Sequence, residues 1–333
     1  MVHKLFKVTD RDKDFFQIYL ENRMPERIFD AHVHLALPEH TANIDPTLLE
    51  TDWAIQSASS MSVEQLGKYA SCLFPGFAYE FLALPLPMKG VDLEANNHYI
   101  SCKSNCALMA VDPCWETKYC EELLLTDGCA GFKPYPNLVS TTKGAEISIF
   151  EFITNAQLRL LDKHKKAVLL HLPRALRLPD DDNIRELREI RHTYPDLKIV
   201  VAHFGRCFNI EPFLEGVKKL GVDIEGFYFD TAAVLNPQVY AAAFDLIAPE
   251  KIIFGTDLPI MLWHGKRTWF KGGYQNLCRE DFKWNKHTEG NEEEDKYTFF
   301  IYEQLKNILD CIGNDEQLKH KVFYENAEQV YTV

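Results

Sequence analysis

The 333-residue sequence lacks several features that would have fixed its class at once. No run of about 18 apolar residues could cross a membrane, and no Gly-x-Gly-x-x-Gly follows an early strand as in a dinucleotide-binding fold. No two Cys-x-x-Cys pairs form a zinc ribbon, and residues 1–14 lack the apolar segment of a secretory signal. These absences argue against a membrane protein, a secreted protein and a nicotinamide-dependent oxidoreductase.

Positive charge is also scarce. The chain has 36 basic and 49 acidic residues, a net charge of -13, which argues against general binding to nucleic acid or anionic membranes. Nine cysteines are scattered without a paired framework, as expected in a reducing compartment. We therefore expect a cytoplasmic protein whose partner is a small molecule. A homo-oligomer is compatible with the sequence, but nothing in it specifies one.

Short apolar runs alternate with amphipathic helical patterns along most of the chain. Helical patterns such as 149–164, 183–192, 211–220 and 236–247 separate the later runs, and this alternation indicates parallel βαβ units. Eight such units favour an α/β fold of the (β/α)₈ TIM-barrel type. The predicted strands are 27–34, 81–85, 106–112, 131–135, 167–171, 198–203, 227–230 and 251–255.

Two long segments interrupt the repeat. Residues 35–80 follow the first predicted strand, and residues 258–295 follow the eighth. In a barrel both lie at the carboxyl ends of the strands, where active sites are built, and loops of this length commonly carry function. No linker-like composition divides the chain, so we expect one domain over residues 1–333 with these two insertions.

His32 and His34 end the first predicted strand. Side chains alternate faces along a strand, so residues two apart point the same way. Both imidazoles can therefore reach one point from a rigid support, as two ligands of a metal ion do. Alone the pair is weak evidence, because many such histidines are surface or core residues.

The other predicted strand ends supply more polar side chains. His203 lies 32 residues after His171 and 54 before Asp257, with Asp230 halfway along that interval, and Lys133 ends the fourth strand. Each residue alone could be a core residue or a helix cap, but residues at one end of parallel strands converge on one mouth. Imidazole and carboxylate suit zinc, manganese or iron. Asp230 either orients a histidine or caps the next helix, and the sequence leaves both open.

These motifs resemble the amidohydrolase superfamily of metal-dependent TIM-barrel enzymes, and more narrowly its amidohydrolase-2 branch of hydrolases, lactonases and non-oxidative decarboxylases. Asp30-Ala-His-Val-His34 is similar to the family's opening signature, and Phe254-Gly-Thr-Asp-Leu-Pro259 to its closing one. Phe323-Tyr-Glu-Asn-Ala327 resembles its last-helix segment. The resemblance covers nearly the whole chain, and its motifs are specific for the family but not for a substrate.

The resemblance implies roles for individual residues. His32, His34, His171 and Asp257 would ligate one divalent ion, most simply zinc, with manganese or iron as alternatives. His203 would lie beside the ion and polarise the substrate, move a proton or bind a second metal. Lys133 would either be carboxylated and bridge two metals or stay unmodified and contact substrate. We expect one ion rather than two.

The substrate is expected to be anionic. Arg174 and Arg206 each lie three positions beyond a predicted site histidine, and the guanidinium fork binds carboxylate or phosphate bidentately. The alternative is an ordinary loop salt bridge. His264, Lys266 and Arg267 in the second insertion would add positive charge to the same mouth.

We therefore predict a metal-dependent hydrolase of a small anionic ester, lactone or amide. A divalent ion lowers the pKa of its bound water from about 15.7 towards about 7, and Asp257 would take the proton and pass it to the leaving group. The alternative is a metal-dependent non-oxidative decarboxylase of a small unsaturated or aromatic acid. A sugar-acid isomerase and a barrel that binds a ligand without catalysis are weaker alternatives.

Overall fold

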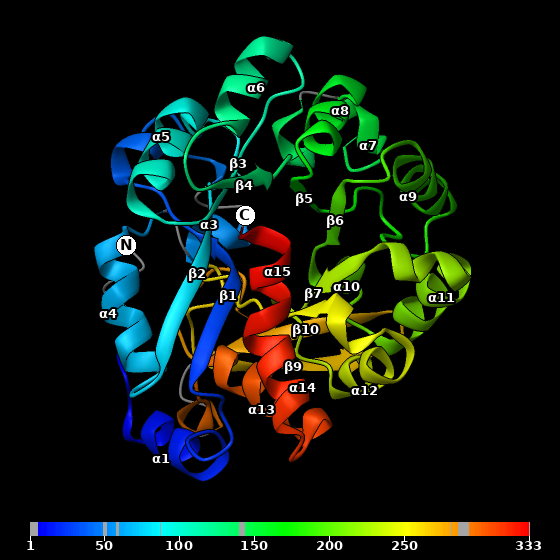
Figure 1. Ribbon diagram of the computed structural model, residues 1–333. Helices are drawn as coiled ribbons and strands as arrows, with labels where there is room; N and C mark the ends of the chain where they lie inside the picture. Colours follow the sequence, from blue (N-terminus) through cyan, green and yellow to red (C-terminus); the bar gives the residue numbers. More distant parts are fainter. Residues whose placement is uncertain are drawn as a thin grey trace.

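Eight parallel strands form a single sheet in the computed structural model, in the order β1 to β8, with helices around the outside (Figure 1). The structure describes residues 6–48, 52–57, 60–86, 88–139, 144–280, 282–285 and 293–332. The sheet closes because β1 also bonds to the chain beyond β8: the amide of Asp257 donates to His32 (2.9 Å), and that of His34 to Leu258 (2.7 Å). The predicted TIM barrel is confirmed.

Most strands are shorter than predicted. β1 has its predicted bounds, whereas β5, β6 and β8 end before His171, His203 and Asp257. His171 and Asp257 lie on the segments just beyond the strands, and His203 is the first residue of α10. The bounds are β1 Arg27–His34, β2 Ala78–Leu84, β3 Ala107–Met109, β4 Cys129–Phe132, β5 Ala167–Leu170, β6 Lys198–Val201, β7 Tyr228–Asp230 and β8 Ile252–Ile253.

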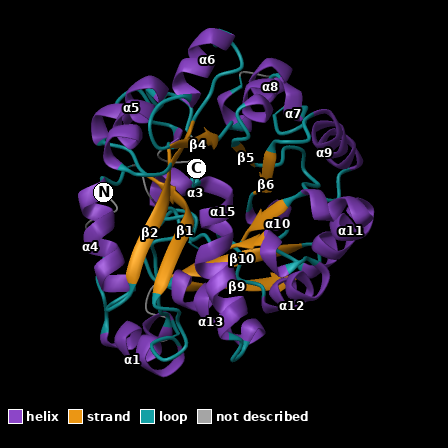
Figure 2. Cartoon of the chain, viewed as in Figure 1, coloured by secondary structure: helices purple, strands orange, loops and turns teal. Residues whose placement is uncertain are grey.

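The helices make a ring around the strands (Figure 2). The single helix predicted over 149–164 is wrong. Two helices stand there, because Thr154 caps the second one in a capping box with Gln157. The α-helices are α1 Asp10–Tyr19, α3 Trp53–Ser57, α4 Val63–Leu73, α5 Leu93–Lys103, α6 Thr117–Leu124, α7 Ile149–Phe152, α8 Asn155–Lys163, α9 Asp181–Thr193, α10 His203–Arg206, α11 Ile210–Leu220, α12 Pro237–Leu246, α13 Phe300–Ile312, α14 Glu316–His320 and α15 Asn326–Tyr331.

The C-terminal helix closes one end of the barrel. Interior side chains from the early parts of the strands form one cluster with Tyr324, Ala327, Val330 and Tyr331, and α15 lies across the strands at the centre of Figure 1. The opposite end, where the strands point, is left for the long loops. Over the described chain, no helix is both long and apolar enough to span a bilayer.

The insertion after β8 contains a hairpin that the sequence did not predict, β9 Gly265–Phe270 paired with β10 Gly273–Cys278. Buried His264 anchors its base: Nε2 lies 3.0 Å from Asp12 on α1, and Nδ1 lies 2.6 Å from Glu280. Burial alone would lower the pKa of His264, but these carboxylates outweigh it and raise the pKa to about 9. An ionic clamp therefore ties the hairpin to the N-terminal helix.

Gly131 on β4 is a position that only glycine can occupy. Its φ is +148°, and a Cβ there would lie 1.8 Å from the carbonyl oxygen of Ala167 on β5. We expect Gly131→Ala to lower the free energy of unfolding by about 3 kcal/mol or more, because backbone cannot move aside. Thermal and denaturant unfolding measure this.

The matched control is Gly67→Ala on α4, where nothing lies within 4 Å of the added methyl group. It should be neutral or stabilising by about 0.5–1 kcal/mol. Equal unfolding midpoints for the two variants would contradict the tight β4–β5 approach.

Candidate active site

A cavity of about 390 Å³ opens at the carboxyl ends of the strands. The loops after β1, β4, β5, β6, β7 and β8 all contribute to its wall, as expected for the active face of a barrel. Seven predicted site residues line it, whereas Arg174 does not. The seven are His32, His34, Lys133, His171, His203, Arg206 and Asp257.

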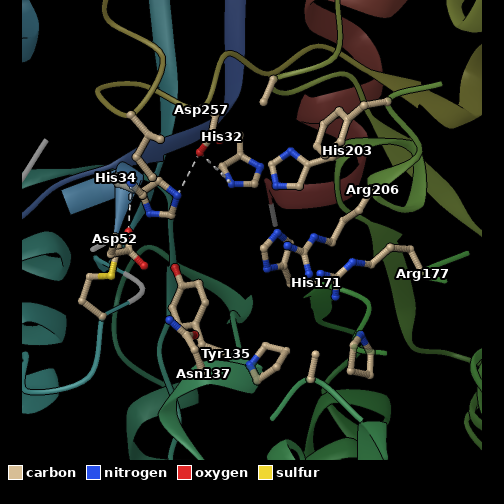
Figure 3. A pocket seen from close by; sticks show the side chains of 18 of the residues that line it. His32, His34, Asp52, Tyr135, Asn137, His171, Arg177, His203, Arg206 and Asp257 are labelled. Atoms are coloured by element: carbon tan, nitrogen blue, oxygen red, sulfur yellow. Dashed lines mark hydrogen bonds and ion pairs between the residues drawn. The ribbon is translucent and has the colours of Figure 1, made fainter. Parts of the chain in front are cut away.

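His32, His34 and Asp257 form a compact group of donor atoms. One carboxylate oxygen of Asp257 lies 3.2 Å from Nε2 of His34 and 3.6 Å from Nε2 of His32, and Figure 3 shows the three side chains converging. All three are buried. Three such donors within 4.8 Å of one another can hold a metal ion.

A local irregularity turns both histidines inward. Phe29 and Ala31 pack inside the barrel, whereas Val33 belongs to the outer cluster against the helices. The register between β1 and β2 shifts between Asp30 and Val33, so the alternation of faces changes phase there. After the shift His32 and His34 face the cavity, as re-aiming by a β-bulge allows.

Hydrogen bonds fix the tautomers of the histidines. Nδ1 of His34 lies 2.8 Å from the Pro85 carbonyl, and Nδ1 of His203 lies 2.8 Å from the Ala232 carbonyl. A carbonyl only accepts, so each Nδ1 carries the proton and each Nε2 presents a lone pair. This is the usual arrangement of metal-ligating histidines.

Asp230 orients His32 in the same way. Its carboxylate lies 2.9 Å from Nδ1 of His32 and accepts the backbone N–H of His203 at 2.6 Å. The helix after β7 is capped by Asn236 instead. Of the two roles left open by the sequence, the structure therefore shows that Asp230 orients the histidine.

Asp30 joins β1 to the segment after β8. It accepts from the Thr256 hydroxyl at 2.5 Å, from the Thr256 amide at 2.9 Å and from the Tyr79 hydroxyl at 2.8 Å. Burial raises the pKa of Asp30 to about 6 despite these bonds, so the carboxylate is ionised at neutral pH. The bonds fix Thr256, and with it Asp257, against the strand that carries His32.

His171 and Lys133 face the same cavity from β5 and β4. The ring of His171 lies 5.0 Å from that of His203, although His171 is not in a group of three close donors. Nζ of Lys133 is buried without a hydrogen-bond partner among the described residues, and burial lowers the pKa of Lys133 to about 8. Burial also lowers the pKa of His203 to about 4, which keeps its Nε2 a proton acceptor at neutral pH.

Arg174 does not line the cavity. Its guanidinium bonds Glu186 at 2.8 Å and Asn183 at 2.6 Å, the salt-bridge alternative for that position. Arg177, three residues later, lines the cavity instead. Arg177 was not predicted from the sequence, although it shares the loop after β5 with Arg174.

The second insertion contributes Arg267 to the cavity wall, but not His264 or Lys266. Arg267 is buried, donates to the Ala233 carbonyl at 2.7 Å and lies over the rings of Phe208 and Tyr274. Those two aromatic residues also line the cavity and were missed, because no local pattern brings the loop after β6 to the β9–β10 hairpin.

Backbone strain concentrates at this face of the barrel. Eight described non-glycine residues have positive φ, and all but Lys165 lie in the loops after β5 to β8. They include His203, Arg206 and Asp257. Such conformations cost roughly 1 kcal/mol or more each and gather at functional sites.

Asp230 provides a test of the histidine geometry. Asp230→Asn should weaken zinc affinity about 10- to 100-fold. The asparagine amide would accept a weaker hydrogen bond from Nδ1 of His32, and its NH₂ group could face the backbone N–H of His203, which is also a donor. Competition with a chromogenic chelator measures the affinity. Asp223→Asn, at an exposed ion pair with Arg188, is the control and should bind as wild type. Unchanged zinc affinity in folded Asp230→Asn would refute this role.

Solved structures of low sequence identity share the fold. An amidohydrolase 2 from Bifidobacterium longum subsp. infantis superposes with a TM-score of 0.55 at 15% identity, over 92% of this chain and 99% of that one. A 5-carboxyvanillate decarboxylase from Novosphingobium aromaticivorans, complexed with manganese and a nitrobenzoic acid, gives 0.58 at 12% identity, over 92% and 96%. A probable 2-pyrone-4,6-dicarboxylic acid hydrolase from Acinetobacter baumannii, with citric acid bound, gives 0.55 at 14%, over 91% and 98%.

Two sequence comparisons give matches to parts of the chain. A 6-methylsalicylic acid decarboxylase of Penicillium expansum is 33% identical over 85 residues, which span 21% of this chain and about a quarter (26%) of that relative. The family model described as Amidohydrolase (Amidohydro_2) matches residues 180–333, the segment that carries His203, Asp230 and Asp257. Over this segment the chain is similar to the amidohydrolase-2 family, and its TIM barrel agrees with that similarity.

Proposed function

We propose that this protein is a metal-dependent hydrolase of a small anionic ester, lactone or amide. The observation that carries the proposal is the donor group of His32, His34 and Asp257, which faces a cavity lined by Arg177, Arg206 and four other cationic or imidazole side chains. The donors suit a divalent ion, and the arginines suit a substrate oxyanion.

The residues present fit one metal ion. Nε2 of His32 and Nε2 of His34 are unprotonated and lie close to the Asp257 carboxylate, and His171 would complete the set from the loop after β5. The group formed by His32, His203 and Asp230 is less suitable, because Asp230 already accepts three hydrogen bonds. We propose zinc, with manganese or iron as alternatives.

A bound divalent ion would polarise the scissile carbonyl and lower the pKa of a nearby water molecule towards about 7. Asp257 is placed to accept a proton from that water and return it to the leaving group. His203 presents Nε2 to the cavity. In its neutral form, Nε2 would accept a proton. Once protonated, it would donate a hydrogen bond to the carbonyl oxygen of the substrate. Lys133, whose Nζ has no hydrogen-bond partner among the described residues, would contact the substrate or, if carboxylated, bridge a second ion.

Non-oxidative decarboxylation of a small unsaturated or aromatic acid is the second candidate. The sequence match to a 6-methylsalicylic acid decarboxylase favours it, and the aromatic walls made by Tyr135, Phe208 and Tyr274 suit a planar acid. In that reaction the carbon–carboxylate bond breaks, CO₂ leaves, and the electron pair stays on the ring carbon. That carbon then takes a proton, which Asp257 or His203 would first accept from solvent water and pass on. The same groups would serve, without attack by water.

A product-resolved screen tests the proposal. Metal-analysed protein is incubated with panels of small lactones, esters, amides and hydroxylated benzoic acids, and acid release and CO₂ release are measured separately. We expect turnover in one panel, lowered at least about 10³-fold in Asp257→Asn, because the residue has two roles. A folded, metal-loaded sample inactive on all panels would refute the hydrolase and decarboxylase proposals together.

The control variant for the screen is Glu316→Gln, at an exposed residue on α14 far in sequence from the cavity-lining residues. Its turnover should equal that of wild type. Equal turnover by Asp257→Asn and Glu316→Gln would remove Asp257 from the chemistry.

A further inference from the structure

We infer that the substrate carries two oxyanion groups, the second of which is held by Arg177 and Arg206 on the side of the cavity opposite His34. This inference rests on the proposed function and narrows its substrate class. One oxyanion or carbonyl group would lie at the donor group of His32, His34 and Asp257, where the chemistry occurs, and the other at the arginine pair.

The two arginines form a built pair rather than two mobile surface side chains. Arg177 follows β5 and Arg206 follows β6, and both donate from Nη1 to the single carbonyl of Leu172, at 3.5 and 3.3 Å. Both have positive φ, 65° and 62°. In Figure 3 their guanidinium groups lie side by side next to His171, across the cavity from His34 and Tyr135.

The pair has no counter-ion in the described part of the chain. No described carboxylate lies within ion-pair distance of Arg177 or Arg206, whereas Arg174, in the same loop, has Glu186 at 2.8 Å. Arg174 therefore has a carboxylate partner, whereas Arg177 in the same loop has none within ion-pair distance among the described residues. Burial, then the neighbouring Arg177, lowers the pKa of Arg206 to about 10, the effect of two like charges in a poorly hydrated place.

The net positive charge of the cavity lining also favours a substrate with two negative groups. Its lining includes Arg177, Arg206, Arg267 and Lys133 against two carboxylates, Asp52 and Asp257. A divalent ion would add two more positive charges. A substrate with one negative group would leave this excess largely uncompensated, whereas a dianion would neutralise the arginine pair and still present its reacting group to Asp257.

Aromatic side chains also line the cavity. Phe208 and Tyr274 meet edge to face with ring centroids 5.2 Å apart, and Arg267 fixes both from behind with its guanidinium 4.8 and 4.4 Å from their ring centroids. Tyr135 also lines the cavity, with its ring 6.4 Å from that of His34, and its hydroxyl donates to the Pro85 carbonyl at 2.7 Å. A flat, unsaturated spacer between two oxyanions matches these walls.

Equilibrium binding without turnover tests the inference. Isothermal titration of the protein, with its metal content measured, compares benzoate, benzene-1,3-dicarboxylate and 3-phosphonobenzoate. We expect at least one dianion to bind about 10- to 100-fold more tightly than benzoate, as an added charge-assisted contact allows. The better of the two dianions tells whether the second group is a carboxylate or a phosphoryl group. Equal affinity for all three compounds would overturn the inference.

Variants of the two arginines test whether these side chains cause the preference for a dianion. Arg177→Gln and Arg206→Gln should each reduce the ratio of dianion affinity to benzoate affinity at least about tenfold. Arg206→Lys, which keeps the charge but loses the fork, should retain part of the preference. Arg188→Gln, at an exposed ion pair with Asp223, is the control and should behave as wild type. Unfolding midpoints show which variants are folded.

Failure of the two proposals can be told apart. A protein that prefers dianions but lacks a divalent ion and turns over nothing would keep the arginine subsite and lose the proposed function. A metal-loaded protein that turns over a monoanion, with no dianion preference or with a preference unchanged in both Gln variants, would keep the function and lose the subsite.

Discussion

The seam between β1 and the chain after β8 is the constraint on which the site depends. Backbone hydrogen bonds join His32 to Asp257 and His34 to Leu258, and buried Asp30 ties β1 to Thr256 through two more. These bonds close the barrel, and they also place an imidazole pair and a carboxylate within reach of one ion. Closure of the barrel and assembly of the donor group therefore depend on the same contacts between the first strand and the chain after the last one.

The rest of the cavity is arranged around charges that the chain leaves unbalanced. Arg177, Arg206, Arg267 and Lys133 line it with few compensating carboxylates, and residues with strained backbone gather in the same loops. Away from the cavity, buried His264 lies between Asp12 and Glu280, and Arg174 pairs with Glu186. Because uncompensated buried charge and strain both oppose folding, their concentration at one face is most simply explained by an anionic ligand and a metal ion that complete the site.

The features that depend on local sequence pattern could be predicted from the sequence. Strand periodicity and unit spacing predicted the barrel, and strand ends predicted that His32, His34, Lys133, His171, His203, Arg206 and Asp257 would meet, as they do. Arg174 was predicted instead of Arg177, because only the folded position of Glu186 decides which of two arginines in one loop is paired. The β9–β10 hairpin and the aromatic wall of Phe208 and Tyr274 could not be predicted, because they exist only through contacts between distant loops.

The central claim is that one divalent ion sits at the β1–β8 seam. Crystals of the zinc-loaded protein, measured on both sides of the zinc absorption edge, test it directly. The account predicts a single anomalous peak at about 2.0–2.2 Å from Nε2 of His32, Nε2 of His34 and the Asp257 carboxylate, with His171 completing the set. A peak between Asp230 and His203 instead, or no peak at full zinc loading, would contradict it.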